Sequence, residues 1–201
     1  MDRKQFIITS SLAAFSLSAF GRVSLDEDNK FTGDCETTND ILGPFYRPKA
    51  PLRQSLVYKG LKGNIINIVG QVYSDDCKTK LEDVLVEIWH CNTDGEYDNE
   101  SSEMLHRATW KTNKKGEYSF KTILPGKYLN GKLYRPSHIH FRVSCKGHQE
   151  LISQIYFAGD PHITEDPWAS QKKAEHRILA VQPVDISGGL QVSFDIFLKK
   201  K

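Results

Sequence analysis

Short stretches of alternating apolar and polar residues recur along the chain beyond residue 40. They occupy residues 65–69, 84–89, 118–123, 139–143, 151–157 and 190–198 and are rich in Val, Ile, Phe and Tyr. Alternation with a period of two is typical of β-strands with one buried face. Turn residues such as Asp94-Gly95, Lys115-Gly116 and Pro125-Gly126 separate the stretches. The pattern predicts an all-β protein, a two-sheet β-sandwich whose long loops carry the metal site argued below.

One stretch and the two ends depart from this pattern. Residues 166–180 predict the only helix, although their apolar residues form no continuous face. Arg3 and Lys4 precede an uncharged apolar run over residues 6–20, which is typical of a secretory signal peptide. We therefore predict a signal peptide over residues 1–21, a polar linker or N-terminal arm over 22–40, and one domain over 41–201. An amphipathic helix lying on the domain is the alternative for residues 6–20.

Composition narrows the class of protein. A net charge of +2 with 26% charged residues is ordinary for a soluble globular chain, and no stripe of basic and aromatic residues predicts nucleic-acid binding. The apolar run is shorter than the roughly 20 residues of a membrane-spanning helix, so we expect no stable membrane span once the signal peptide is removed. Because the run is typical of a signal peptide, we expect export to the periplasm or exterior.

Four cysteines allow three pairings if all are oxidised. Cys35 lies in a polar segment and Cys77 in a turn, so these two are the favoured pair. Cys91 and Cys145 lie in strand-like stretches, where a buried free thiol is the common state. No CxxC spacing predicts a zinc-thiolate site.

Candidate metal ligands begin with the segment His138-Ile-His140. Residues two apart in a strand project from the same face, so the two imidazoles converge while Ile139 points away. Such a pair alone is also common on ordinary strands. Tyr97 and Tyr128 each follow a tight turn at an end of the predicted sandwich, although packing explains either tyrosine equally well when it is taken alone.

Seven segments resemble, in order, the intradiol ring-cleavage dioxygenases, which include protocatechuate 3,4-dioxygenases and catechol or hydroxyquinol 1,2-dioxygenases. The segments are residues 42–46, 86–97, 112–120, 125–128, 135–141, 154–161 and 194–198. The resemblance implies that Tyr97, Tyr128, His138 and His140 hold Fe(3+). It implies that O2 cleaves a catecholic substrate between its two hydroxyls to give a muconate-type diacid. Hard anionic oxygen donors favour ferric over ferrous iron.

The resemblance also implies roles around the metal. Tyr128 would leave the metal and accept a proton when the substrate binds. Arg135 would stabilise negative charge developing on the ring, and Gln154 would contact the substrate pocket. From the residues alone, Arg135 could equally be a surface ion-pair partner and Gln154 a cross-strand hydrogen-bonding residue.

Two departures leave the substrate and the assembly open. Tyr134 stands where protocatechuate enzymes commonly carry tryptophan, and the loop from Tyr128 to Arg135 is short. The helical dimerisation segment of catechol 1,2-dioxygenases is missing, whereas protocatechuate enzymes use two unlike subunits, so a homodimer and an unlike partner subunit both stay open.

The main alternative is a non-enzymatic prealbumin-like binding module, because the hairpin pattern over residues 112–128 is shared with such modules. That interpretation leaves the segment from Arg135 to His140 unexplained. A zinc or copper site at the same histidines is a further alternative, which two tyrosinate ligands disfavour.

Overall fold

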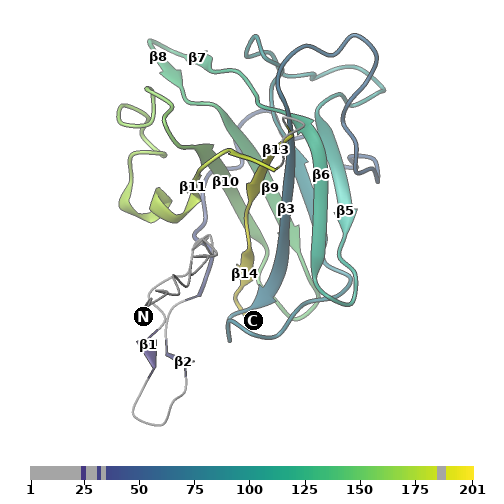
Figure 1. Cartoon of the computed structure of the whole chain (residues 1–201), viewed down its shortest axis with the longest axis vertical. Coiled ribbons are helices and arrows are strands. Elements are labelled where there is room, and N and C mark those ends of the chain that lie inside the picture. Colours follow the sequence, from purple (N-terminus) through teal and green to yellow (C-terminus); the bar gives the residue numbers. More distant parts are fainter. Residues whose placement is uncertain (1–23, 26–30, 33–34, 185–188) are drawn as a thin grey trace, which may run out of the picture.

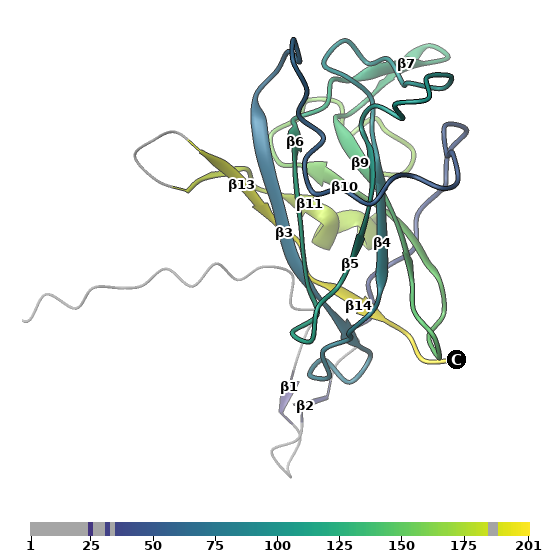
Figure 2. The same cartoon turned by 90° about the vertical axis from the view of Figure 1, so that its right-hand side faces the viewer.

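The computed structural model describes residues 24–25, 31–32, 35–184 and 189–201. The predicted signal peptide, residues 1–21, lies outside the described residues. Two mixed sheets stack face to face, and the hairpin of β7 (Tyr128–Asn130) and β8 (Leu133–Arg135) lies at the end opposite the C-terminus (Figures 1 and 2). The structure confirms the predicted all-β sandwich.

One sheet has the strand order β11-β10-β9-β4-β5. Its strands are β4 (Leu85–Trp89), β5 (Arg107–Lys111), β9 (His138–Ser144), β10 (Leu151–Phe157) and β11 (Ile178–Leu179). The other sheet contains β3 (Ile65–Ser74), β6 (Glu117–Ile123), β12 (Gln182–Pro183), β13 (Leu190–Ser193) and β14 (Ile196–Leu198). A short separate pair joins β1 (Ser24–Leu25) with β2 (Phe31–Thr32).

The core lies between the two sheets, where alternate side chains of facing strands meet. Ile66 and Ile68 of β3 and Phe120 of β6 pack against Phe141 of β9 and its neighbours. Tyr118, expected as a core residue, is buried and donates a hydrogen bond from its hydroxyl to the Phe194 carbonyl. The period-two pattern therefore identified the buried faces correctly.

The predicted strand over residues 190–198 is two strands, because the chain is interrupted at Phe194 and Asp195. The Phe194 amide bonds to the Val69 carbonyl, and the Asp195 carboxylate accepts from the Gln71 amide. Between these contacts, a Cβ on Gly70 would lie 1.9 Å from the Phe194 oxygen. Only glycine permits this close backbone approach, so the interruption depends on Gly70.

The predicted helix over residues 166–180 was wrong in extent. A single 3-10 helix, η1 (Lys172–Arg177), replaces it, preceded by turns that the Asp166 side chain caps. Strand β5, the short β7–β8 hairpin and the two-residue strands β1, β2, β11 and β12 were not predicted. Within the described part of the chain, no helix is long and apolar enough to cross a membrane.

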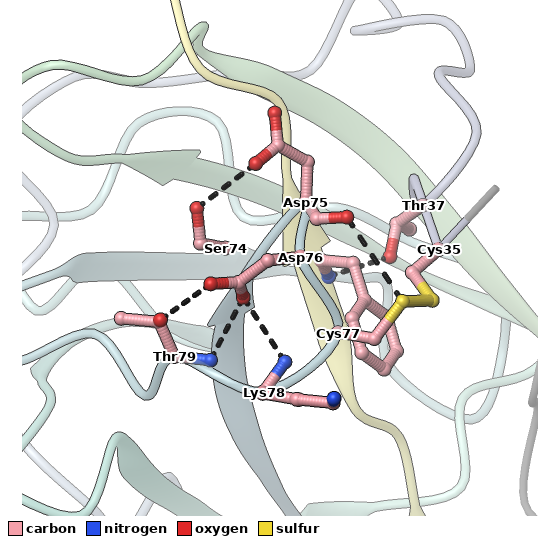
Figure 3. The surroundings of a disulfide bond; sticks show 9 residues. Cys35, Thr37, Ser74, Asp75, Asp76, Cys77, Lys78 and Thr79 are labelled. Carbon is pink, nitrogen blue, oxygen red and sulfur yellow. Dashed lines mark hydrogen bonds between the residues drawn. A yellow bond between two sulfur atoms is a disulfide. The ribbon is translucent and has the colours of Figure 1, made fainter. Parts of the chain in front are cut away.

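Part of the predicted linker is packed on the sandwich. The Thr37 amide donates to the Phe197 carbonyl, and the Asp40 amide donates to the Ile152 carbonyl. The favoured pairing is confirmed, since Cys35 is joined to Cys77 in the turn after β3 (Figure 3). Residues 35–40 are therefore fixed against both sheets.

Candidate metal centre

Strand β9 presents two buried histidines at the end of the sandwich near the β7–β8 hairpin. His138 and His140 are each 1% exposed, and their ring centroids are 5.0 Å apart. Ile139 between them points into the hydrophobic core. The strand period therefore brings the two imidazoles to one face, as predicted.

Tyr97 and Tyr128 reach the same place from two different loops. The Tyr97 hydroxyl lies 3.3 Å from Nε2 of His138, and its ring is centred 6.3 Å from that of His140. The Tyr128 ring is centred 5.7 Å from the His138 ring and 5.8 Å from the Tyr97 ring. The structure thus brings the four predicted ligands together.

Two tight turns that pack on each other fix the positions of the tyrosines. In the first turn, which leads to Tyr97, the Asn92 side chain accepts hydrogen bonds from backbone amides. The backbone carbonyl of Asn92 accepts from the amide of Gly126 in the second turn, which leads to Tyr128. Gly95 has φ of +85°, and a Cβ there would lie 2.4 Å from the Lys127 carbonyl oxygen. Phe45 adds a ring stacked on Tyr97 with centroids 4.2 Å apart.

The ring nitrogens of the two histidines differ in their partners. Nδ1 of His138 lies 2.7 Å from the Pro136 carbonyl, so that nitrogen carries the proton and Nε2 keeps its lone pair. Nδ1 of His140 is buried and has no hydrogen-bond partner, while its ring stacks on Trp89 with centroids 4.8 Å apart. Fixing one nitrogen by a backbone contact is the usual arrangement around metal-binding histidines.

Burial sets the protonation of these side chains in the metal-free protein. Loss of solvent lowers the pKa of His138 to about 3 and the pKa of His140 well below its ordinary value. Burial also raises the pKa of Tyr97 well above its ordinary value. The imidazoles are therefore neutral, as metal ligands must be, and the Tyr97 phenolate needs a cation beside it to form.

The donor set suits a hard trivalent cation. Among the described residues, no three His, Cys, Asp or Glu side chains are grouped so that they could hold a metal ion, so any site here requires the tyrosines. A bound trivalent cation would favour the deprotonated phenols, as cations do for thiols and water. Two phenolates would then neutralise most of its charge. The residues present fit ferric iron better than zinc or copper.

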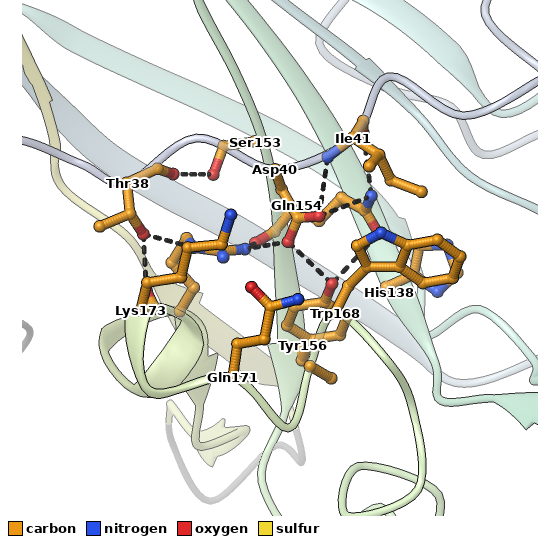
Figure 4. Close-up of polar contacts among 12 residues, drawn as sticks. Thr38, Asp40, Ile41, His138, Ser153, Gln154, Tyr156, Trp168, Gln171 and Lys173 are labelled. Atoms are coloured by element: carbon orange, nitrogen blue, oxygen red, sulfur yellow. Dashed lines mark hydrogen bonds and ion pairs between the residues drawn. The ribbon is translucent and has the colours of Figure 1, made fainter.

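Arg135 and Gln154 lie in a buried polar network beside the histidines. Figure 4 shows Gln154 of this network together with His138. Nη1 of Arg135 is 3.5 Å from Nε2 of His138, and Nη2 donates to Oε1 of Gln154 at 3.1 Å. The Gln154 amide in turn donates to the Ile41 carbonyl at 2.9 Å. Gln154 therefore contacts Arg135 directly, in addition to any contact with a substrate.

Sequence reasoning missed two buried carboxylates in this network. Asp166 accepts from Nε of Arg135 at 2.8 Å, and Asp40 accepts from Nη1 of Arg177 at 2.7 Å. The Tyr156 hydroxyl also donates to Asp40, at 2.9 Å (Figure 4). Asp40 ended the supposed linker and Asp166 opened the supposed helix. The one signal in the sequence was Arg135 itself. An arginine that lies in an apolar segment and is buried on folding needs a buried anion as its partner.

Several residues singled out from the sequence lie outside the cluster. Tyr134 is 44% exposed and packs near His162 on the outer side of the hairpin. His90 and Cys91 are buried residues that directly follow strand β4, and neither belongs to the cluster. A ring nitrogen of His90 forms a hydrogen bond with the Thr122 hydroxyl at 2.6 Å. Cys91 and Cys145 are free thiols, as predicted, but only Cys91 is buried; Cys145 is partly exposed.

The fold and the cluster together define a class of protein, a β-sandwich with a mixed tyrosine and histidine site at one end. A family model described as dioxygenase matches residues 41–200. Among curated relatives, the catechol 1,2-dioxygenase of Candida albicans is 33% identical over 151 residues, which are 65% of this chain and 50% of that protein. The chlorocatechol 1,2-dioxygenase of Rhodococcus opacus is 28% identical over 196 residues, 86% of this chain and 75% of that protein.

A solved structure has a similar fold. The dioxygenase domain of a dioxygenase and carbohydrate-binding protein fusion from Streptomyces sp. SirexAA-E is 28% identical, with a TM-score of 0.71 over 83% of this chain and 99% of that one. The chain belongs to the intradiol ring-cleavage dioxygenase family. It spans about half the length of the Candida relative.

Proposed function

We propose that this chain is a non-haem ferric-iron dioxygenase that cleaves a catecholic ring between its two hydroxyls. Both atoms of O2 would enter the product, a muconate-type diacid. The observation that carries the proposal is the convergence of two phenols and two neutral imidazoles at one end of the sandwich. Catechol as the substrate class is supported by the names of the relatives.

Tyr97, Tyr128, His138 and His140 would hold the iron. When bound, ferric iron would accept the two substrate oxygens and withdraw electron density from the ring, so that the ring reacts with O2. Tyr97 is held by the stacked ring of Phe45, and its hydroxyl lies 3.3 Å from Nε2 of His138.

Tyr128 is suited to the second predicted role, as the phenol that takes up a substrate proton. It begins the β7–β8 hairpin, whose next residues Leu129 and Asn130 are exposed. Tyr128 itself is partly exposed, whereas the two histidines are buried. Its phenolate oxygen would accept the proton of one catechol hydroxyl, leaving the substrate as a monoanion at that oxygen.

Arg135 would balance that negative charge. Its guanidinium is buried beside His138 and keeps its charge, because a carboxylate pairs with it. In a site shielded from water, a fixed cation stabilises a developing anion more strongly than it would in solution.

Oxygen uptake with a panel of catechol, protocatechuate and hydroxyquinol tests the proposal. We expect uptake of one O2 per substrate consumed and a diacid product by mass spectrometry. His138→Ala should abolish uptake, whereas Tyr118→Phe, a core change away from the cluster, should preserve it. No uptake with any of the three would favour the non-enzymatic sandwich module instead. Sedimentation of the active sample would distinguish a monomer, a homodimer and a need for an unlike subunit.

We also propose that the mature protein is exported after removal of residues 1–21. The Cys35–Cys77 disulfide supports this, because such bonds persist mainly in oxidising compartments. N-terminal sequencing of the protein from its native host should start near residue 22. A retained Met1 would contradict export by this route.

A further inference from the structure

The guanidinium of Arg135 is held on three sides. Nε donates to Asp166 at 2.8 Å, and Nη2 donates to Gln154 at 3.1 Å. The Trp168 ring covers one face, with its centroid 4.4 Å from Cζ. Among the described residues, Nη1 contacts no carboxylate or carbonyl group, and it faces Nε2 of His138 at 3.5 Å. Nη1 is thus the donor of the guanidinium that points to the candidate metal centre.

Asp166 binds both the turn before η1 and Arg135, and its Oδ1 also accepts from Nη2 of Arg135 at 3.5 Å. Oδ1 accepts from the backbone amides of Trp168 at 3.0 Å and Ala169 at 2.7 Å, which caps the turn before η1. Oδ2 accepts from Nε of Arg135. The carboxylate is 1% exposed, so water cannot replace either contact readily. The turn and the arginine are therefore tied to one rigid anchor.

The rest of the network cannot substitute for this carboxylate. Gln154 is neutral, and its amide is already oriented by the Ile41 carbonyl. Asp40 forms its ion pair with Arg177 instead. Across the described residues, Asp166 is the one carboxylate in an ion pair with Arg135. Without it, a long side chain with several rotamers would lose the contact that fixes the direction of Nη1.

We infer that Asp166 is a positioning residue, which holds Arg135 so that Nη1 meets an anionic oxygen of the bound catecholate. The inference rests on the proposed function. It adds that the loop between β10 and η1, far from His138 and His140 in sequence, contributes to the rate of ring cleavage. Asp166 does so through Arg135, without touching the substrate.

Asp166→Asn in the iron-loaded protein separates positioning from folding. The asparagine oxygen can still cap the turn, but its NH2 group would face Nε of Arg135, donor against donor. We expect kcat to fall about ten- to a hundredfold, as displacement of a catalytic group by about 1 Å commonly does. Iron content and the tyrosinate absorption band should be retained. Glu165→Gln, the same change at the exposed neighbouring residue, should leave kcat unchanged.

A double variant tests whether the effect passes through Arg135. Arg135→Gln and Arg135→Gln/Asp166→Asn should have the same kcat within about threefold, because Asp166 then has nothing to position. Arg135→Gln leaves the buried carboxylate of Asp166 without its partner. If Arg135→Gln does not fold, the kcat of the uncharged double variant is compared with that of Asp166→Asn instead. These two values should also agree within about threefold. Anaerobic catechol titration, followed by the visible spectrum, should show weakened binding in all three variants.

Three outcomes would overturn the inference. The first is a wild-type kcat in Asp166→Asn. The second is a kcat of the double variant tenfold below that of Arg135→Gln. The third is loss of iron and colour together with activity in Asp166→Asn. The last would indicate collapse of the site. A wild-type protein without colour or oxygen uptake would instead overturn the proposed function itself, so the two failures are distinguishable.

Discussion

At the residue scale, the turn after β3 shows how one side chain fixes a local conformation. Asp76 accepts hydrogen bonds from the Thr79 amide at 2.8 Å and from the Lys78 amide at 3.0 Å, and a third comes from the Thr79 hydroxyl (Figure 3). The contacts from Thr79, above all, lower the pKa of Asp76 to about 2. The ionised carboxylate is therefore preferred by the folded state.

The sign of the pH effect follows from that lowered pKa. Stabilisation by Asp76 is fully present above its unfolded pKa of about 3.9 and is lost as pH falls through about 2. We expect Asp76→Asn to lower the free energy of unfolding at pH 7 by about 1 kcal/mol, a value reduced for solvent screening. In urea unfolding, the difference from wild type should shrink between pH 4 and pH 2. Glu82→Gln, at an exposed position, is the control; a pH-independent difference at Asp76 would contradict this account.

At the element scale, residues 35–41 act as a strap between the two sheets and the candidate site. The disulfide of Cys35 ties one end to the turn after β3, and the Asp40 carboxylate reaches Arg177 and Tyr156 at the other. The sequence predicted the cysteine pair but described this strap as linker. Its backbone hydrogen bonds depend on partners more than 100 residues away, which no local pattern records.

Removing the disulfide should loosen this strap. The bond closes a sequence separation of 42, for which loop entropy predicts about 4 kcal/mol. We expect Cys35→Ser/Cys77→Ser to lower the free energy of unfolding by about 2–4 kcal/mol in urea. Cys145→Ser, at a free thiol, is the matched control and should change it little. Equal stability of the double variant and wild type would contradict the role of residues 35–41.

At the scale of the whole molecule, local patterns predicted the sandwich and the pair on β9, because strand period alone decides which residues share a face. They did not predict the buried Arg135–Asp166 pair, which depends on how the loop after β10 folds back. The choice of Tyr97 and Tyr128 from eight tyrosines came from family resemblance. The structure adds an independent reason, the packing of their two turns through Asn92 and Gly126.

The visible absorption spectrum of the iron-loaded protein tests the central claim most directly. Phenolate bound to ferric iron absorbs visible light by charge transfer, so we predict a burgundy solution with one iron per chain. Tyr97→Phe should lose the colour and the iron, whereas Tyr118→Phe, which keeps the cluster intact, should retain both. A colourless iron-loaded protein, or equal loss of colour in both variants, would contradict the assignment of Tyr97, Tyr128, His138 and His140 as the metal site.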